Sequence, residues 1–316
     1  MPILDILQND NISVSFEFFP PKTEAGWEKL FKTVSALVPL HPSYVSITYG
    51  AGGSTREHTH ELVVRIQRET GIPVVAHLTC VGATREEVTN ALQRYSETGI
   101  RHVLALRGDC PPGMSEEDAW PEDGFGQAAD LVSFIKERFP QMGVGVAGFP
   151  QGHPRTPNCL REMEFLKKKV DAGADWIVTQ LFFDNRDFYD FCDRCAFYGI
   201  EVPITPGVMP ITSVRNMHRI AELAGGARIP AALMKAVWRA ETPEYMRNVG
   251  VHWATEQVRD LIENGVAGIH FYTLNHSHAS LDICRTLGLK NYLNLTSTVT
   301  AETGDRSFLE AAAAGG

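Results

Sequence analysis

Glu17 is the residue whose setting first points to chemistry. It lies near the end of the apolar run Ile12–Phe18, which is typical of a buried strand, and Pro20 and Pro21 follow it. An ionised carboxylate in such a strand is costly, so it is usually paired or its pKa is raised until it holds a proton near neutral pH. Glu17 is therefore either a general acid or one half of a buried ion pair that only braces the fold.

Polar residues also stand at the ends of most other apolar runs. They are Thr48, His77, Thr79, Arg107, Asp109, His153, Thr179, Gln180, Tyr272, Thr273 and Asn275. Taken singly, each has a structural explanation: His77 can be a hydrogen-bonded core histidine, and Arg107 and Asp109 can form an ion pair with each other. Their shared position at the carboxyl ends of strands favours one polar mouth over an apolar barrel.

The elements that position these residues alternate along the chain. Eight apolar runs are expected to be strands: Ile12–Phe18, Tyr44–Tyr49, Pro73–Leu78, His102–Arg107, Val144–Phe149, Trp176–Leu181, Val202–Val208 and Ile269–Thr273. Eight amphipathic stretches are expected to be helices: Glu24–Val38, Arg56–Glu69, Thr84–Glu97, Gln127–Phe139, Cys159–Ala172, Arg186–Tyr198, Ser213–Leu223 and Thr242–Glu263. This alternation predicts an α/β fold, a single (β/α)8 TIM-type barrel, with an open doubly wound sheet as the alternative.

The same reading divides the chain into a barrel and a tail. Residues 1–292 form the catalytic barrel, and Ala224–Ala240 add a small helical insertion before the last helix, Thr242–Glu263. Residues 293–316, which end in small residues, are expected to be a weakly ordered tail.

Composition excludes several classes of function. The formal net charge is −9 and the basic residues are scattered, so no nucleic-acid surface is expected. No run of about 18 apolar residues suits a membrane span. The N-terminus lacks a signal-peptide pattern and the six cysteines are dispersed, so we expect a cytoplasmic protein. Cys192 and Cys195 form a C-x-x-C inside a helical pattern, which favours core packing over a redox or metal role.

The polar mouth also lacks the usual catalytic motifs. No set of His, Cys and acids has metal-ligand spacing, so no metal is expected. Nucleophile, phosphate-loop and G-x-G-x-x-G dinucleotide signatures are absent. A few acids, amides, an arginine and aromatic rings instead suit a large planar cofactor that carries the difficult chemistry.

Eight motifs together resemble those of one enzyme family. They are Ser15–Lys22 (SFEFFPPK), Val45–Gly50 (VSITYG), His77–Cys80 (HLTC), Gly99–His102 (GIRH), Leu106–Pro112 (LRGDCPP), Lys169–Ala174 (KVDAGA), Thr179–Asp184 (TQLFFD) and His270–Asn275 (HFYTLN). The chain resembles the bacterial 5,10-methylenetetrahydrofolate reductases, flavoproteins with a (β/α)8 barrel, from about residue 11 to residue 289.

The resemblance implies a reaction and its cofactors. The family reduces methylenetetrahydrofolate to 5-methyltetrahydrofolate in a ping-pong cycle, with tightly bound FAD as carrier and NADH or NADPH as hydride donor. The residues leave NADH and NADPH unresolved, with NADH the expectation for a short bacterial form, and FAD rather than FMN rests on the resemblance. A homo-oligomer is expected because family members tend to form dimers or tetramers.

The resemblance also assigns site residues. Glu17 matches the general acid that protonates folate N10, and Asp109 matches the acid beside the flavin and the folate. The residues expected to contact the cofactor are Thr48, His77, Leu106, Arg107, Gly108, Asp109, Ala128, Phe149, His153, Glu162 and Lys169. Those expected to contact the substrate are Glu17, Asp109, Gln180, Phe182, Val214, Tyr272 and His276.

Four positions depart from the family pattern. Val214 replaces a stacking aromatic ring, His276 replaces an arginine that meets the folate tail, and Gln127 and Phe149 each replace a tyrosine. Phe182 or Phe183 is expected to compensate for Val214. Two other functions stay open: a tetrahydrofolate-dependent methyltransferase or demethylase on the same fold, and a folate- or flavin-binding subunit of a larger complex.

Overall fold

One parallel sheet forms the centre of the molecule. The computed structural model describes residues 3–8, 12–48, 56–110, 113–156, 158–214, 217 and 227–289. Within these residues, nine strand segments follow the order β7-β6-β5-β4-β3-β2-β1-β9-β8. They are β1 (Ser13–Phe18), β2 (Tyr44–Ile47), β3 (Val74–Thr79), β4 (His102–Leu106), β5 (Gly143–Gly148), β6 (Trp176–Thr179), β7 (Ile204–Thr205), β8 (Gly207–Val208) and β9 (Gly268–Tyr272).

The two ends of the sheet meet at Pro206. β7 pairs with β6 and β8 pairs with β9, while Pro206 alone separates β7 from β8. Proline has no N–H to give to a sheet, which explains why the predicted strand Val202–Val208 is divided. The strand order also lacks the reversal of a doubly wound sheet. The sheet is thus a nearly closed parallel barrel, in agreement with the predicted α/β, TIM-type architecture.

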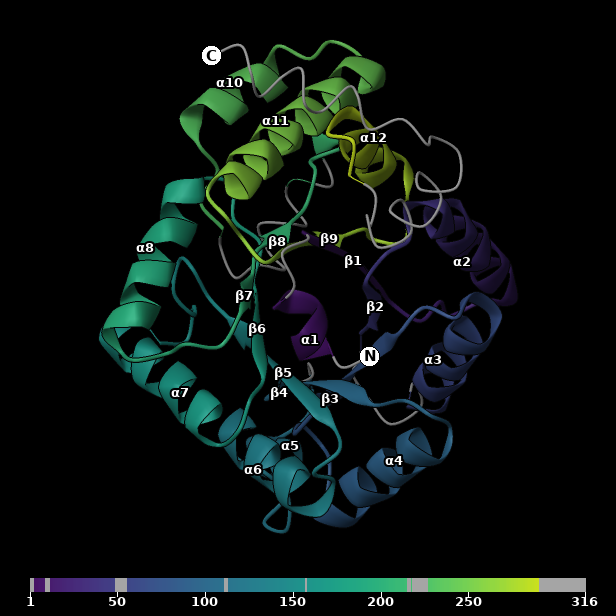
Figure 1. Ribbon diagram of the computed structural model, residues 1–316, viewed down its shortest axis with the longest axis vertical. Coiled ribbons are helices and arrows are strands. Elements are labelled where there is room, and N and C mark those ends of the chain that lie inside the picture. The colour runs from purple at the N-terminus through teal and green to yellow at the C-terminus, as the bar shows by residue number, and fades with distance from the viewer. Residues whose placement is uncertain are drawn as a thin grey trace, which may run out of the picture.

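Helices surround the barrel, except for α1 at its centre (Figure 1). They are α1 (Ile3–Leu7), α2 (Glu24–Leu37), α3 (Arg56–Thr70), α4 (Arg85–Glu97), α5 (Glu116–Ala119), α6 (Ala128–Arg138), α7 (Cys159–Asp171), α8 (Asn185–Phe197), α10 (Ala231–Trp238), α11 (Pro243–Glu263) and α12 (His278–Thr286), with a 3-10 turn at Val38–Leu40. Seven of the eight predicted helices are present with bounds that shift by a residue or two. The eighth, Ser213–Leu223, lies largely outside the described residues.

The C-terminal part of the prediction needs one correction. α12 follows β9, so the predicted last helix, Thr242–Glu263, is instead the penultimate one, α11. The nine residues of α12 were missed because they are few and begin with polar side chains. α10 lies within the expected insertion Ala224–Ala240, and the expected tail, residues 293–316, lies outside the described residues.

Alternation along β1 gives the barrel an unusual interior. The even-numbered residues of β1 belong to the main hydrophobic core between the sheet and the helices. The odd-numbered residues Ser13, Ser15 and Glu17 occupy the opposite face, because successive side chains of a strand point to opposite sides. The inside of this barrel therefore carries polar groups where bulky aliphatic residues are common.

The sequence analysis also missed α1, which packs inside the barrel. Ile3 and Leu7 are buried in a second cluster with Tyr44 and Trp176. Ile3 N donates to Nε2 of His102, on β4, at 3.2 Å. Figure 1 shows α1 at the middle of the ring of helices. α1 therefore plugs the end of the barrel where the strands begin.

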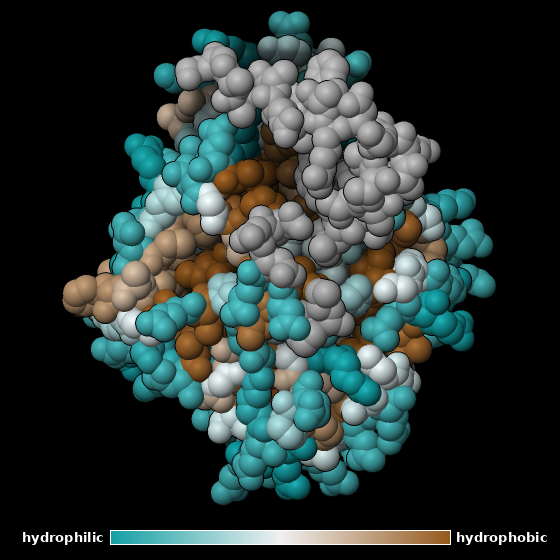
Figure 2. Space-filling view, viewed as in Figure 1, coloured by the Kyte–Doolittle hydropathy of each residue, from teal (hydrophilic) through white to brown (hydrophobic). Residues whose placement is uncertain are grey.

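The face in Figure 2 is hydrophilic along most of its rim, while apolar surface gathers toward the centre. Among the described residues, no helix combines the length and the apolar character that a membrane crossing requires.

Candidate active site

Glu17 lies between two imidazole rings. Its carboxylate Oε2 is 3.4 Å from His77 Nε2 and 3.7 Å from His270 Nε2. The Glu17 side chain is 19% exposed, whereas the side chains of His77 and His270 are 7% and 2% exposed. Glu17 lies on β1, His270 on the neighbouring strand β9, and His77 on β3, which β2 separates from β1. The carboxyl group is therefore accessible from the barrel mouth, while the imidazole rings of His77 and His270 enclose it on the other sides.

His270 is fixed by neighbours on β1 and β2. Its Nδ1 is 2.8 Å from Ser15 Oγ, and its Nε2 is 3.4 Å from Ser46 Oγ. The ring stacks on Tyr44 with 6.0 Å between centroids and meets the edge of Tyr272 at 5.2 Å. The sequence analysis quoted His270 in a motif but gave it no role. The period-two pattern of a strand could have placed it on the same face as Tyr272.

His77 occupies the opposite side of Glu17. Its Nε2 faces the carboxylate in a geometry that makes no hydrogen bond. Burial lowers the pKa of His77, although the negative charge of Glu17 opposes that shift. His77 is therefore a neutral ring near neutral pH. Thr79, two residues further along β3, likewise has a buried hydroxyl oxygen without a hydrogen-bond partner among the described residues.

The loop after β4 carries the second predicted acid. Gly108 has φ of +81°, and a Cβ there would lie 2.6 Å from Val81 Cγ1, so glycine is required. Asp109 is 82% exposed and lies 3.4 Å from Arg155. Arg107 donates to Gly126 O at 3.0 Å and its guanidinium lies 3.9 Å from the centre of the Trp120 ring. Arg107 and Asp109 thus have separate partners, which disfavours the mutual ion pair.

Several basic residues lie on the same side of the barrel mouth as Asp109. His153 Nδ1 accepts a hydrogen bond from Arg155 N at 3.1 Å, and the His153 ring meets the edge of Phe149 at 4.7 Å. Burial lowers the pKa of His153, and Asp109 opposes that shift, whereas Arg155, Lys169 and Arg107 reinforce it. These charges therefore converge on one region. The sequence analysis missed Arg155, because an exposed loop arginine has no distinctive pattern.

Lys169 reaches this region from α7. Its Nζ donates to Ala147 O on β5 at 2.7 Å. Burial lowers the pKa of Lys169 to about 8, and the carboxylate of Glu162 opposes the shift. Burial also raises the pKa of Glu162, which Lys169 opposes. The two groups lie seven residues apart, two turns along one helix face.

The remaining predicted cofactor contacts lie at element ends. Thr48 follows β2 and its N–H donates to Phe18 O at 2.9 Å. Leu106 ends β4 and packs against the cluster that includes α1. Ala128 begins α6.

Hydrogen bonds connect the ends of β6, β8 and β9 at the barrel mouth. Tyr272 OH donates to Thr179 O at 2.8 Å, and Gly207 N donates to Thr179 Oγ1 at 2.9 Å. Thr273 Oγ1 donates to Glu17 O at 2.6 Å. The side-chain oxygen of Gln180 accepts from Leu181 N at 2.9 Å, so its amide nitrogen remains the group to offer a ligand. These contacts tie the predicted substrate residues to the strand ends.

A cavity of about 320 Å³ opens beside these strand ends. Its lining comprises Met209, Pro210, Thr212, Ser213, Tyr272, Thr273, Leu274, His276, Ala279 and Ser280. Tyr272 and His276 thus share one cavity, and Val214, 50% exposed, follows its lining residue Ser213. Burial lowers the pKa of His276, with Lys29 and His278 adding to the shift.

Phe182, which is predicted to contact the substrate, is buried in the structure. Its side chain has no exposed surface and stacks on Phe188 with 5.4 Å between ring centres. Phe183 is also buried, in the cluster of α10 and α11. Apolar packing holds both aromatic rings away from the surface on which Val214 lies.

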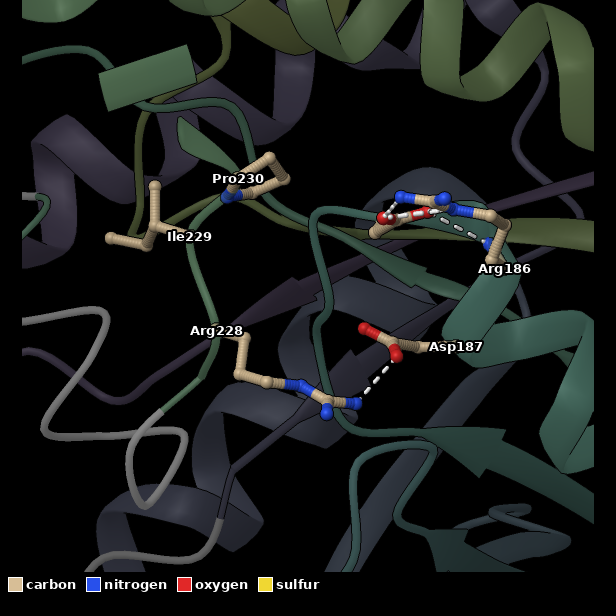
Figure 3. A pocket seen from close by; sticks show the side chains of 6 residues that line it. Arg186, Asp187, Arg228, Ile229 and Pro230 are labelled. Atoms are coloured by element: carbon tan, nitrogen blue, oxygen red, sulfur yellow. Dashed lines mark hydrogen bonds and ion pairs between the residues drawn. The ribbon is translucent and has the colours of Figure 1, made fainter. Parts of the chain in front are cut away.

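A larger cavity of about 440 Å³ lies away from Glu17, at the start of α8 (Figure 3). It is lined by Asp184, Arg186, Asp187, Arg228, Ile229 and Pro230. Both arginines are paired with aspartates, Arg186 with Asp184 and Arg228 with Asp187. It contains none of the predicted site residues, so the smaller cavity is the better candidate for the substrate.

Two further observations limit the chemistry. Among the described residues, no group of three or more His, Cys, Asp or Glu side chains could hold a metal ion. Burial raises the pKa of Cys192 to about 11 and that of Cys195 to about 12, so both remain thiols near neutral pH. Redox exchange needs a thiolate, and this C-x-x-C disfavours one.

Known proteins resemble the chain over nearly all of these elements. The family model for methylenetetrahydrofolate reductase matches residues 3–288. The 5,10-methylenetetrahydrofolate reductases of Salmonella typhimurium and Escherichia coli are each 38% identical, over 88% of this chain and 92% of their own length. The methylenetetrahydrofolate reductase (NADH) 1 of Arabidopsis thaliana is 39% identical over 91% of this chain, which spans half of that relative's length.

A solved structure shares the fold at low identity. An uncharacterized protein from Clostridium thermocellum that binds two copies of 5-methyl-5,6,7,8-tetrahydrofolic acid superposes with a TM-score of 0.63. It is 16% identical and the match covers 90% of this chain and 97% of that one. This likeness supports the barrel architecture alone.

Proposed function

Because the chain belongs to the methylenetetrahydrofolate reductase family, we propose that it reduces 5,10-methylenetetrahydrofolate to 5-methyltetrahydrofolate, with FAD as carrier and NADH or NADPH as donor. The observation that carries the proposal is Glu17, a partly exposed carboxyl group enclosed by two buried imidazoles at the mouth of the barrel. The (NADH) in the name of the Arabidopsis relative favours NADH. The two reactants would use the site in turn.

Glu17 would supply the proton that opens the substrate. Protonation of N10 breaks the C–N bond of the five-membered ring and leaves an iminium cation that can accept hydride. A general acid that is positioned for such a transfer typically contributes about 10²- to 10⁴-fold in rate. Asp109 would stabilise the cation by its fixed negative charge, and the amide nitrogen of Gln180 would hydrogen-bond the pterin.

The residues around Asp109 fit a flavin dinucleotide. Arg107, Arg155, His153 and Lys169 offer cationic or donor groups suited to phosphates and a ribityl chain. The buried Thr79 hydroxyl and His77 Nε2 lack hydrogen-bond partners among the described residues and could receive them from a ligand. FAD would supply reversible hydride transfer. Thr48, Leu106, Gly108, Ala128, Phe149 and Glu162 would complete its contacts.

We also propose a strand count for the barrel and an oligomeric state. We count β7 and β8 as one seventh strand, which gives a (β/α)8 barrel with α10 in an insertion. We also propose a homo-oligomer, in line with the family expectation. Light scattering of the purified protein tests the second point, and a mass equal to the 35.0 kDa chain would exclude it.

An anaerobic visible titration tests the function. Purified protein should show a flavin band that NADH bleaches and that methylenetetrahydrofolate restores, since each half-reaction moves one hydride. A protein that stays colourless after incubation with FAD would contradict the reductase and favour the methyltransferase or the binding subunit. If NADH bleaches the band and methylenetetrahydrofolate does not restore it, the reduced flavin passes its hydride to a different substrate.

A further inference from the structure

The guanidinium of Arg107, just after β4, is held in two places. Its Nε donates to Gly126 O at 3.0 Å, and its central carbon lies 3.9 Å from the centre of the Trp120 ring. A guanidinium stacked on an aromatic face keeps its in-plane N–H donors for other partners. Within the described part of the chain, the two terminal amino groups of Arg107 make no hydrogen bond or ion pair. They are therefore presented to a ligand in a fixed plane.

Backbone contacts anchor the segment that carries Trp120. Gly82 N, in the connection between β3 and α4, donates to Ala119 O at 2.8 Å, directly before Trp120. Four residues after Trp120, Gly124 forms an antiparallel bridge with Thr84 of the same connection. The indole is thus attached to the barrel on both sides along the chain, although it lies in a long connection.

The ring of Trp120, rather than its nitrogen, explains why an indole stands here. Trp120 is half-buried, and its Nε1 is buried without a hydrogen-bond partner among the described residues. An unpaired buried N–H group destabilises a fold. The benefit of the side chain therefore comes from what its ring contacts, and the charged group on that ring is the Arg107 guanidinium.

We propose that Trp120 is a positioning residue, which holds the Arg107 guanidinium in the plane in which it binds a phosphate group of FAD. Arginine presents its donors as a flat fork that matches phosphate oxygens. A long side chain that is already held loses less conformational freedom when the ligand binds. The inference rests on the proposed function, which makes FAD the cofactor and Arg107 one of its contacts.

The rate at which the diluted holoenzyme releases FAD, followed by flavin fluorescence, tests the inference without an activity assay. Trp120→Ala should speed release about tenfold, because the cation loses its aromatic partner. Trp120→Phe keeps an aromatic face without an N–H group, so release should stay within about threefold of the wild-type rate. Trp238→Ala is the matched control, since it removes an indole that is 75% exposed on α10 and should leave the rate unchanged.

A double variant separates positioning from support of the connection. Trp120 acts through Arg107, so Trp120→Ala should add less than about twofold to the release rate of Arg107→Ala. Effects that multiply would overturn the inference, as would Trp120→Phe releasing FAD as fast as Trp120→Ala, which would assign the effect to the indole N–H.

Two further outcomes keep the inference and the proposed function distinguishable. If Trp120→Ala does not fold, Trp120→Leu takes its place, because leucine keeps apolar volume but has no ring. A wild-type protein that holds FAD, with unchanged release in the ring-less variant, would overturn the inference alone. A wild-type protein that neither carries nor takes up FAD would overturn the proposed function and the inference together.

Discussion

At the scale of residues, two carboxylates have opposite surroundings. Glu17 is 19% exposed and lies between imidazoles, whereas Asp109 is 82% exposed beside Arg155. The first setting suits a group that acts on a ligand inside an enclosed site, and the second suits a negative charge presented at the barrel mouth. Paired carboxylates with divergent environments are how acid and charge-stabilising roles are divided in many sites.

Glu17→Gln should separate the two half-reactions. The amide keeps the size of the side chain but cannot donate an acidic proton, so we expect folate reduction to fall by about 10²-fold or more. Flavin reduction by NADH should change little, because it needs no proton from Glu17. Stopped-flow measurement of each half-reaction checks this. Equal loss in both would remove the acid role.

Asp109→Asn should act through charge. Loss of the negative charge beside the proposed flavin should raise its reduction potential and slow folate reduction by about tenfold or more. Spectroscopic titration against a reference dye measures the potential. Glu122→Gln, at an exposed acid in a later part of the same connection, is the control. A variant with unchanged potential and rate would exclude Asp109 from the mechanism.

The sequence predicted the residues with the strongest local signals. Glu17 stood out because a carboxylate in an apolar strand is rare, and the polar strand ends followed from the barrel topology. The surroundings of His270 and Arg155 were not predicted because they depend on neighbours far away in the chain, such as Ser15, 255 positions before His270. Phe182, which the sequence assigned to the substrate, is buried in the structure, and an aromatic residue has the same sequence pattern at a ligand as in a core.

At the scale of elements, capping and periodicity predicted most boundaries. Thr84 and Glu87 form the expected capping box at the start of α4. The sequence analysis did not predict the helices α1, α5 and α12, which are short. Short helices carry few turns of periodicity, and tertiary packing rather than propensity stabilises them. The split at Pro206 was readable from the proline itself.

α1 should contribute measurably to stability. Leu7→Ala removes a buried side chain that packs against the inner barrel cluster, so we expect a loss of about 2–5 kcal/mol in the free energy of unfolding. Asp5→Ala, at an exposed position of the same helix, should change it by less than about 0.5 kcal/mol. Urea denaturation followed by circular dichroism compares them. Equal effects would mean that α1 does not plug the barrel.

At the scale of the whole molecule, stability should fall in acid. Burial lowers the pKa of His102 to about 4, and His102 accepts the hydrogen bond from α1. The unfolded chain then binds more protons, so the contribution of His102 is full above pH 6.5 and is lost as the pH falls toward about 4. His102→Gln should flatten this part of the profile by up to about 3 kcal/mol. The midpoints of urea denaturation between pH 4 and pH 7 measure this effect in the wild type and in His102→Gln. Parallel pH profiles of the two proteins would contradict the prediction.

The division at Pro206 has a consequence for how ligand and fold depend on each other. β7 and β8 have two residues each, so few ladder hydrogen bonds fasten the barrel along that line. Met209 and Tyr272 line the 320 Å³ cavity from the β8–β9 side of this junction, and Tyr272 OH donates across it to Thr179 O on β6. A ligand that binds there and contacts Tyr272 would stabilise this weakly hydrogen-bonded junction. A ligand bound in this cavity should therefore slow the hydrogen exchange of β7 and β8 first. The barrel should open most readily at this junction when the cavity is empty.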